Sequence, residues 1–286
     1  MLDFDYTAPQ SLSDAIQLLA VSGSRPLAGG TDLIDHLRTG RQTAAHVVDV
    51  KRIPELNRLE ISTTGLRIGA AVPCWRILAD ADIARRWSAL ADACQIIGGV
   101  QIQSRASVGG NLCNSGPAAD SIPALVALHA NCVIAGPQGQ RTVPVETFCT
   151  APGKNVLQPG ELLVELLLPV PAAHTGSHYQ RFIPRNEMDI AVVGVGASLT
   201  LTKGVISAVR ISLGAVAPRP LMTTSVAPLL IGQAPSEALF HRAGEAARSE
   251  ISPIDDMRGT ADFRRHITGV LVERALAVAA QRAASA

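Results

Sequence analysis

Apolar residues in the first 170 positions recur with the spacing of short helices and buried strands. A capping pattern at Ser11–Asp14 predicts the start of a helix that runs to about Val21. Further helices are predicted over residues 33–37 and 75–97, the second with a break near Ala84. Short apolar runs bounded by turn residues predict strands over residues 46–50, 66–71, 132–135, 142–145 and 162–168.

The pattern changes after residues 169–177, a segment with two prolines and a glycine that predicts a domain boundary near residue 175. Two β-rich runs, 191–202 and 205–215, are separated by Lys203-Gly204, a turn signal that predicts a hairpin. Helical patterns follow over residues 237–249 and 262–284. We therefore expect an α+β chain with two domains, residues 1–175 and 176–286.

Composition and charge narrow the class of protein. Charged residues make up 17% of the chain, and 25 basic residues balance 24 acidic ones to a net charge of +1. No basic stripe or long apolar segment occurs, so we expect neither nucleic-acid binding nor a membrane segment. The acidic start is unlike a signal peptide, and the five cysteines contain no CxxC pair. A cytoplasmic protein with reduced thiols and no metal site is expected, and its weak net charge favours association with other subunits.

The first segment with candidate binding chemistry runs from Pro26 to Leu33. A strand enters Gly29-Gly30, and Thr31 and Asp32 are suitable N-caps for the helix that follows. Glycines let a backbone approach a ligand closely, and N–H groups at a helix start favour phosphate oxygens. The alternative is a tight strand-to-helix turn with an ordinary cap.

The second candidate segment lies within residues 98–123, a stretch rich in glycine, serine, asparagine and proline that predicts a long polar loop. It contains Ser107-Val108-Gly109-Gly110-Asn111, followed by Asn114 and Asp120. A polyhydroxylated or phosphorylated ligand would satisfy these polar groups, and a loop whose side chains bond one another is the alternative. A second glycine pair about 80 residues after the first favours a diphosphate ligand.

Other catalytic patterns are absent from the sequence. Gly194-Val195-Gly196 begins like a dinucleotide fingerprint, but the third glycine is missing and the segment is predicted to be a hairpin. No P-loop, HExxH or GxSxG motif occurs, and no histidine has an arguable catalytic partner. We predict no catalytic residue in this chain and expect a cofactor to supply the chemistry.

Three segments in this order resemble the FAD-binding medium subunits of molybdenum hydroxylases, the xanthine dehydrogenase and carbon monoxide dehydrogenase family: Ala28–Leu33, Ser107–Asn111 with Pro117–Pro123, and Pro184–Ala191. The resemblance spans nearly the whole chain. It implies a two-subdomain FAD-binding fold of the vanillyl alcohol oxidase/PCMH type, split near residue 55, followed by a C-terminal α+β domain. It also implies non-covalent FAD. The molybdenum cofactor and [2Fe–2S] clusters are then expected only on a large and a small partner subunit, in a dimer of heterotrimers.

Residue by residue, the resemblance implies that Pro26, Leu27, Ala28, Gly29, Gly30, Thr31, Asp32 and Leu33 form one diphosphate loop. Ser107, Val108, Gly109, Gly110 and Asn111 would form the other, with Asn114 nearby. Asp120 matches a residue that bonds the ribityl hydroxyls, and Ile97 and Leu163 match positions that flank the adenine. Ile190 matches a residue against the flavin ring, and Arg181 a basic contact. Without the resemblance, Ile97, Leu163 and Ile190 would be interpreted as core residues.

Two departures limit what the resemblance implies. Members similar to carbon monoxide dehydrogenase have a histidine at the position of Thr31 and an aromatic residue at that of Ile190, which argues against a carbon monoxide substrate. The cysteine-rich insertion of 4-hydroxybenzoyl-CoA reductase is also missing. The alternatives are a self-contained flavin oxidase of the same fold class and an assembly subunit without flavin. The sequence names neither substrate nor final electron acceptor.

Overall fold

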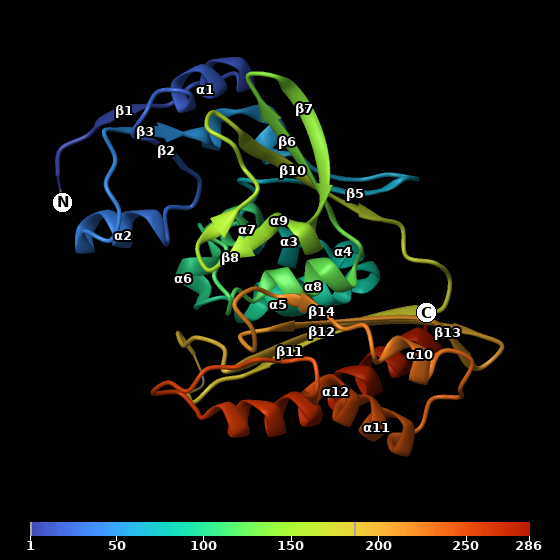
Figure 1. The fold of residues 1–286 in the computed structure, drawn as a ribbon. Helices are drawn as coiled ribbons and strands as arrows, with labels where there is room; N and C mark the ends of the chain where they lie inside the picture. The colour runs from blue at the N-terminus through green and yellow to red at the C-terminus, as the bar shows by residue number, and fades with distance from the viewer. Residues whose placement is uncertain (1, 186) are drawn as a thin grey trace.

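A computed structural model describes residues 2–185 and 187–286 of the chain. The elements lie in successive layers, with most of the helices of the first 130 residues held between two sheets and the last two helices beneath the lower sheet (Figure 1). The sequence thus folds as an α+β protein.

The first 50 residues form a small three-stranded parallel sheet of order β1-β3-β2, made of Asp5–Thr7, His46–Asp49 and Ser24–Leu27. Two helices, α1 (Leu12–Leu19) and α2 (Leu33–Thr39), connect its strands. The Ser11 hydroxyl accepts a hydrogen bond from the Asp14 N–H, so the predicted cap of α1 is confirmed.

The second sheet has five antiparallel strands in the order β4-β5-β10-β6-β7. Their bounds are Leu59–Ile61, Gly65–Gly69, Leu162–Pro169, Asn131–Gly136 and Gly139–Pro144. The predicted split near residue 55 falls between the two sheets, in a pair of 3-10 turns at Val50–Arg52 and Pro54–Asn57. As a division into separate units it stays a prediction.

Helices fill the space below this sheet. They are α3 (Cys74–Leu78), α4 (Ala81–Arg86), α5 (Ser88–Ile96), α6 (Val100–Gln103), α7 (Val108–Asn114), α8 (Ser121–Ala127) and α9 (Val145–Phe148). A two-stranded ladder of β8 (Cys149–Ala151) and β9 (Lys154–Asn155) follows α9. The predicted break near Ala84 is wrong: the chain bends before Asp80, which caps α4, and again at Trp87.

The last 110 residues form an antiparallel sheet in the order β11-β12-β13-β14. Its strands are Thr175–Phe182, Val193–Thr202, Val205–Gly214 and Leu221–Met222, and the hairpin predicted at Lys203-Gly204 joins the second and third. The helices α10 (Ala227–Leu230), α11 (Glu237–Arg248) and α12 (Ala261–Ala284) complete this part. In Figure 1, α5 and α8 cover one face of the sheet and α12 covers the other.

Candidate functional site

The first glycine pair lies between β2 and α2. Gly30 has a φ of +80°, a left-handed conformation that residues with a side chain rarely adopt. Within residues 2–185 and 187–286, the backbone N–H groups of residues 29–32 donate no hydrogen bond to the protein. Four consecutive unused donors suit the oxygens of an anionic ligand.

The caps predicted for α2 are wrong. Asp32 stands at the N-cap position with φ −99° and ψ −48°, and its side chain makes no capping hydrogen bond. A capping side chain normally needs an extended backbone at its own residue, and the backbone of Asp32 is already helical. The helix ends at Gly40, whose φ of +73° is the left-handed conformation that glycine adopts readily.

The fold brings the first glycine pair against the residues just before the second segment, although Gly29 and Arg105 are 76 positions apart. A Cβ atom on Gly29 would lie 2.1 Å from the carbonyl oxygen of Arg105, so only glycine permits this approach of the two backbones. The Arg105 Nε–H also donates to the Gly29 carbonyl over 3.1 Å. Arg105 lies two residues before Ser107, where the second candidate segment begins. Sequence reasoning missed Arg105, because no motif marks it.

The second segment is helical, and the prediction of a long loop over residues 98–123 is wrong. Three short helices, α6, α7 and the start of α8, occupy it because buried apolar residues such as Val108 and Leu112 anchor them. The Ser107 hydroxyl caps α7 by accepting from the Gly110 N–H over 3.0 Å. Asn111 Oδ1 accepts from the Ser121 hydroxyl over 2.6 Å, which ties α7 to α8. Asn114, the last residue of α7, is half-buried.

The two neighbouring glycines of α7 have different surroundings. A Cβ atom on Gly109 would lie 2.5 Å from the carbonyl oxygen of Ala70, so the space beside Gly109 is taken by the protein's own backbone. A Cβ atom on Gly110 would meet only the Ser107 hydroxyl, at 3.0 Å. Gly110 is therefore the less enclosed glycine of this pair.

A buried ion pair joins Asp120, at the start of α8, to β11. Arg181 Nη1 donates to Asp120 Oδ2 over 2.5 Å, and the Tyr179 hydroxyl donates to Asp120 Oδ1 over 2.8 Å. Burial raises the pKa of Asp120 to about 6, although the Arg181 charge and both hydrogen bonds oppose that rise. The Nε–H of Arg181 is buried without a hydrogen-bond partner among the described residues. A buried donor that is left unpaired costs free energy of folding.

The three apolar candidates differ in exposure. Ile97 and Leu163 are 8% and 1% exposed and belong to the core between the five-stranded sheet and the helices, so in the chain alone they are packing residues. Ile190 is 51% exposed, which suits a surface that a planar ligand covers. It lies in the third resembling segment, of which Asn186 is outside the described residues.

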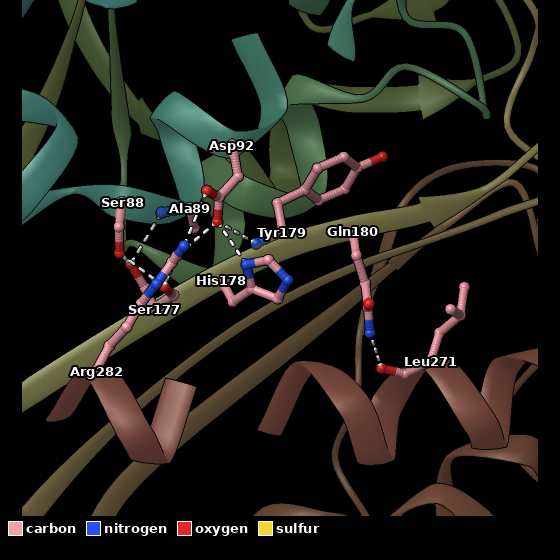
Figure 2. Close-up of polar contacts among 9 residues, drawn as sticks. All are labelled: Ser88, Ala89, Asp92, Ser177, His178, Tyr179, Gln180, Leu271 and Arg282. Atoms are coloured by element: carbon pink, nitrogen blue, oxygen red, sulfur yellow. Dashed lines mark hydrogen bonds and ion pairs between the residues drawn. The ribbon is translucent and has the colours of Figure 1, made fainter. Parts of the chain in front are cut away.

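A second polar cluster holds β11 against α5 and α12 beside the Asp120 pair (Figure 2). Arg282 donates two hydrogen bonds to the Asp92 carboxylate, over 2.6 and 3.1 Å, and His178 Nδ1 lies 2.6 Å from Asp92 Oδ2. Burial alone would raise the pKa of Asp92, but these hydrogen bonds outweigh it and lower the pKa below its usual value. The Asp92 carboxylate of α5 is thus held by both β11 and α12.

A cavity of about 600 Å³ lies elsewhere, where the β4–β5 turn and the end of β10 approach β13. Its lining includes Arg67, His129 and Arg210, and none of the candidate residues. Arg67 and Arg210 are each paired with a glutamate, Glu165 and Glu146. The cavity is therefore separate from the candidate site.

Comparison with known families identifies the class of protein. Residues 2–171 match the family described as the FAD binding domain in molybdopterin dehydrogenase. Residues 178–279 match the CO dehydrogenase flavoprotein C-terminal domain. The chain therefore belongs to the family of FAD-binding medium subunits of xanthine dehydrogenase and carbon monoxide dehydrogenase, and it is an oxidoreductase subunit with an FAD-binding domain.

Individual relatives match along their whole length. The chain is 33% identical to the xanthine dehydrogenase FAD-binding subunit of Escherichia coli O157:H7, covering 98% of this chain and 97% of the relative. It is 31% identical to the medium chain of carbon monoxide dehydrogenase from Hydrogenophaga pseudoflava, with 98% of both chains covered. A crystal structure of that enzyme, lacking the Mo-pyranopterin moiety, superposes with a TM-score of 0.93 over 98% of both chains. No described helix is long and apolar enough to cross a membrane.

Proposed function

We propose that this chain binds one FAD non-covalently between its two glycine-containing segments. Residues 26–33, with their four unused N–H groups, and residues 107–111, with the less enclosed Gly110, would hold the diphosphate. Asp120 and Arg181 would bond the ribityl and neighbouring polar groups, Ile190 would cover the flavin ring, and Ile97 and Leu163 would flank the adenine. The four unused N–H groups at residues 29–32 and the left-handed backbone of Gly30 fit such a cofactor.

The chain would act as the electron-transfer subunit of a three-subunit molybdenum hydroxylase. A large partner subunit would hold the molybdenum cofactor and oxidise the substrate, and a small one would carry two [2Fe–2S] clusters. A bound flavin accepts electrons one at a time and releases them in pairs. NAD or another acceptor would receive them, in a dimer of heterotrimers. The chain's own residues bind and orient the flavin and leave part of it accessible.

The observation that carries this proposal is the contact of Gly29 with the Arg105 backbone. It brings the first glycine pair, with its four unused N–H groups, beside the residues that lead into the second segment, so a diphosphate with two arms could contact both segments. The full-length match to subunits named for FAD binding and for carbon monoxide dehydrogenase supports a role in which this chain carries the flavin and a partner subunit oxidises the substrate.

Anaerobic reduction tests this role. We expect the flavin-loaded chain, mixed with aldehydes or nitrogen heteroaromatics, to keep its visible flavin absorbance. After the small and large partners are added, a substrate of the complex should bleach it. A chemical one-electron donor should bleach the isolated chain and serves as the positive control.

Two other results would replace the proposal. Bleaching by substrate without partners would identify a self-contained flavin oxidase with its own substrate site. A purified chain that binds no flavin in titration would identify an assembly subunit. The four unused N–H groups of residues 29–32 argue against that second reading, because they are donors suited to an anionic ligand.

A further inference from the structure

Strand β11 lies at the edge of the last sheet, and alternate residues along it face the first domain. Ser177, Tyr179 and Arg181 share one face of the strand, as residues two apart must. The Ser177 hydroxyl accepts from the Ala89 N–H over 3.1 Å, and Arg181 Nη2 donates to the Ile96 carbonyl over 2.8 Å. The two bonds fix this face of β11 against both ends of α5 (Figure 2 shows the Ser177 end).

Tyr179 lies between these two anchors. Its side chain is 2% exposed, and its hydroxyl passes over Gly194 of β12, where a Cβ atom would lie 2.6 Å from the hydroxyl oxygen. Gly194 therefore leaves the room that the phenol needs. The hydroxyl donates its hydrogen bond to Asp120 Oδ1.

Both oxygens of the Asp120 carboxylate are thus held by β11, one by Tyr179 and one by Arg181. No other charged or titratable group of the described residues, on α5, α7, α8 or β12, shifts the pKa of Asp120. The place of this carboxylate consequently depends on two side chains of β11, and the same two side chains oppose the rise in pKa that its burial causes.

We propose that Tyr179 is a positioning residue for FAD: it orients the Asp120 carboxylate, together with Arg181, to accept a hydrogen bond from the cofactor. This inference rests on the FAD site proposed above and adds a residue that touches Asp120 and not the cofactor. Because burial raises the pKa of Asp120 to about 6, the loss of one donated hydrogen bond raises it further and leaves less carboxylate ionised at neutral pH.

The test is the FAD affinity of the full apo-chain, measured from pH 5 to pH 8 by quenching of flavin fluorescence. We expect Tyr179→Phe to weaken FAD binding about tenfold at pH 7, the scale of one hydrogen bond to a charged group. The pH at which affinity falls by half on acidification should move upward. Gln180→Met is the matched control, since Gln180 on the opposite face donates to the Leu271 carbonyl over 2.7 Å, away from Asp120 (Figure 2).

Gly194→Ala provides a second route that keeps the phenol. The new methyl group should displace the hydroxyl and reproduce the affinity loss and pH shift of Tyr179→Phe. In the Tyr179→Phe background the same change should add little, because the hydroxyl that it meets is gone and the nearest ring carbon would lie at 3.4 Å. Asp120→Asn should abolish the pH dependence in both backgrounds.

The outcomes separate the two proposals. A wild-type chain without FAD affinity would refute the FAD site itself. A wild-type chain that binds FAD, with Tyr179→Phe lowering thermal stability but leaving affinity and its pH midpoint unchanged, would refute only the positioning role. Additive effects of Gly194→Ala and Tyr179→Phe would also refute it.

Discussion

At the scale of single residues, two neighbouring glycines have different surroundings. Gly109 and Gly110 are adjacent in α7, yet the first packs against the backbone of Ala70 and the second has only the Ser107 hydroxyl close to its Cβ position. The sequence presents them as one motif, and both were predicted to serve a ligand. Their difference depends on Ala70, 39 positions earlier, and no local pattern reports it.

Alanine at each position separates folding from binding. We expect Gly109→Ala to lower the free energy of unfolding by about 1–3 kcal/mol, because its methyl group overpacks against backbone atoms that cannot turn aside. Gly110→Ala should cost less stability than Gly109→Ala, because its methyl group meets only the Ser107 hydroxyl and no backbone atom, and it should weaken FAD binding. Urea denaturation and flavin titration measure the two effects. Equal stability losses, with unchanged FAD affinity in Gly110→Ala, would contradict the assignment.

The partner of Asp120 also lay beyond the reach of the sequence. Asp120 has no basic neighbour in sequence, and Arg181 reaches it from 61 positions away on a strand that starts within the predicted boundary segment. The family resemblance implies a binding role for both residues, but only the fold shows that they form one ion pair. Tyr179 carries no signal beyond the alternation of polar residues in β11.

At the scale of elements, the turn signal between two β-rich runs predicts a hairpin correctly, whereas the composition of residues 98–123 conceals three helices. The Lys203-Gly204 hairpin was predicted because turn residues separate two β-rich runs, and the structure confirms it. The helices within residues 98–123 were missed because glycine, serine and asparagine are poor helix formers. Tertiary packing overrides that preference: Val108 and Leu112, four positions apart, are both fully buried. Their spacing behind the Ser107 cap was the available signal.

The free energy of unfolding should depend on pH, because the contact of α5 with β11 and α12 uses the ionised carboxylate of Asp92. Its lowered pKa means that this contribution is present above the pKa of an unfolded aspartate, about 3.9, and is lost as pH falls through the folded value. Asp92→Asn should cost about 1–3 kcal/mol at pH 7, where it leaves Arg282 without a charged partner, and less below pH 4. Urea midpoints at pH 7 and pH 3.5 measure this. Asp82→Asn, whose side chain is 62% exposed, is the control and should change little.

If Asp92→Asn lowers the free energy of unfolding equally at both pH values, the charge of the carboxylate does not contribute and only its shape does. A loss of similar size in Asp82→Asn would show that the effect is one of net charge. Either result would show that the ionised form of Asp92 does not stabilise the contact of α5 with β11 and α12.

At the scale of the whole molecule, each layer covers the next, and the proposed flavin site draws residues from both domains. We expect the flavin to be held without a covalent bond. Acid precipitation of the purified chain should therefore leave yellow FAD in the supernatant, and chromatography should identify it as unmodified FAD. Colour that stays in the pellet would indicate a covalent link and favour the oxidase alternative.

The dependence of Asp120 on β11 limits how this chain can be recombined with its relatives. A chimera joined at residues 170–174 would keep every glycine of the two cofactor segments and still receive a foreign β11. Grafting would then succeed only if the donor sequence brings a tyrosine, a basic residue and a small residue at the positions of Tyr179, Arg181 and Gly194. These three positions and Asp120 must therefore be exchanged together, although they lie on opposite sides of the predicted domain boundary.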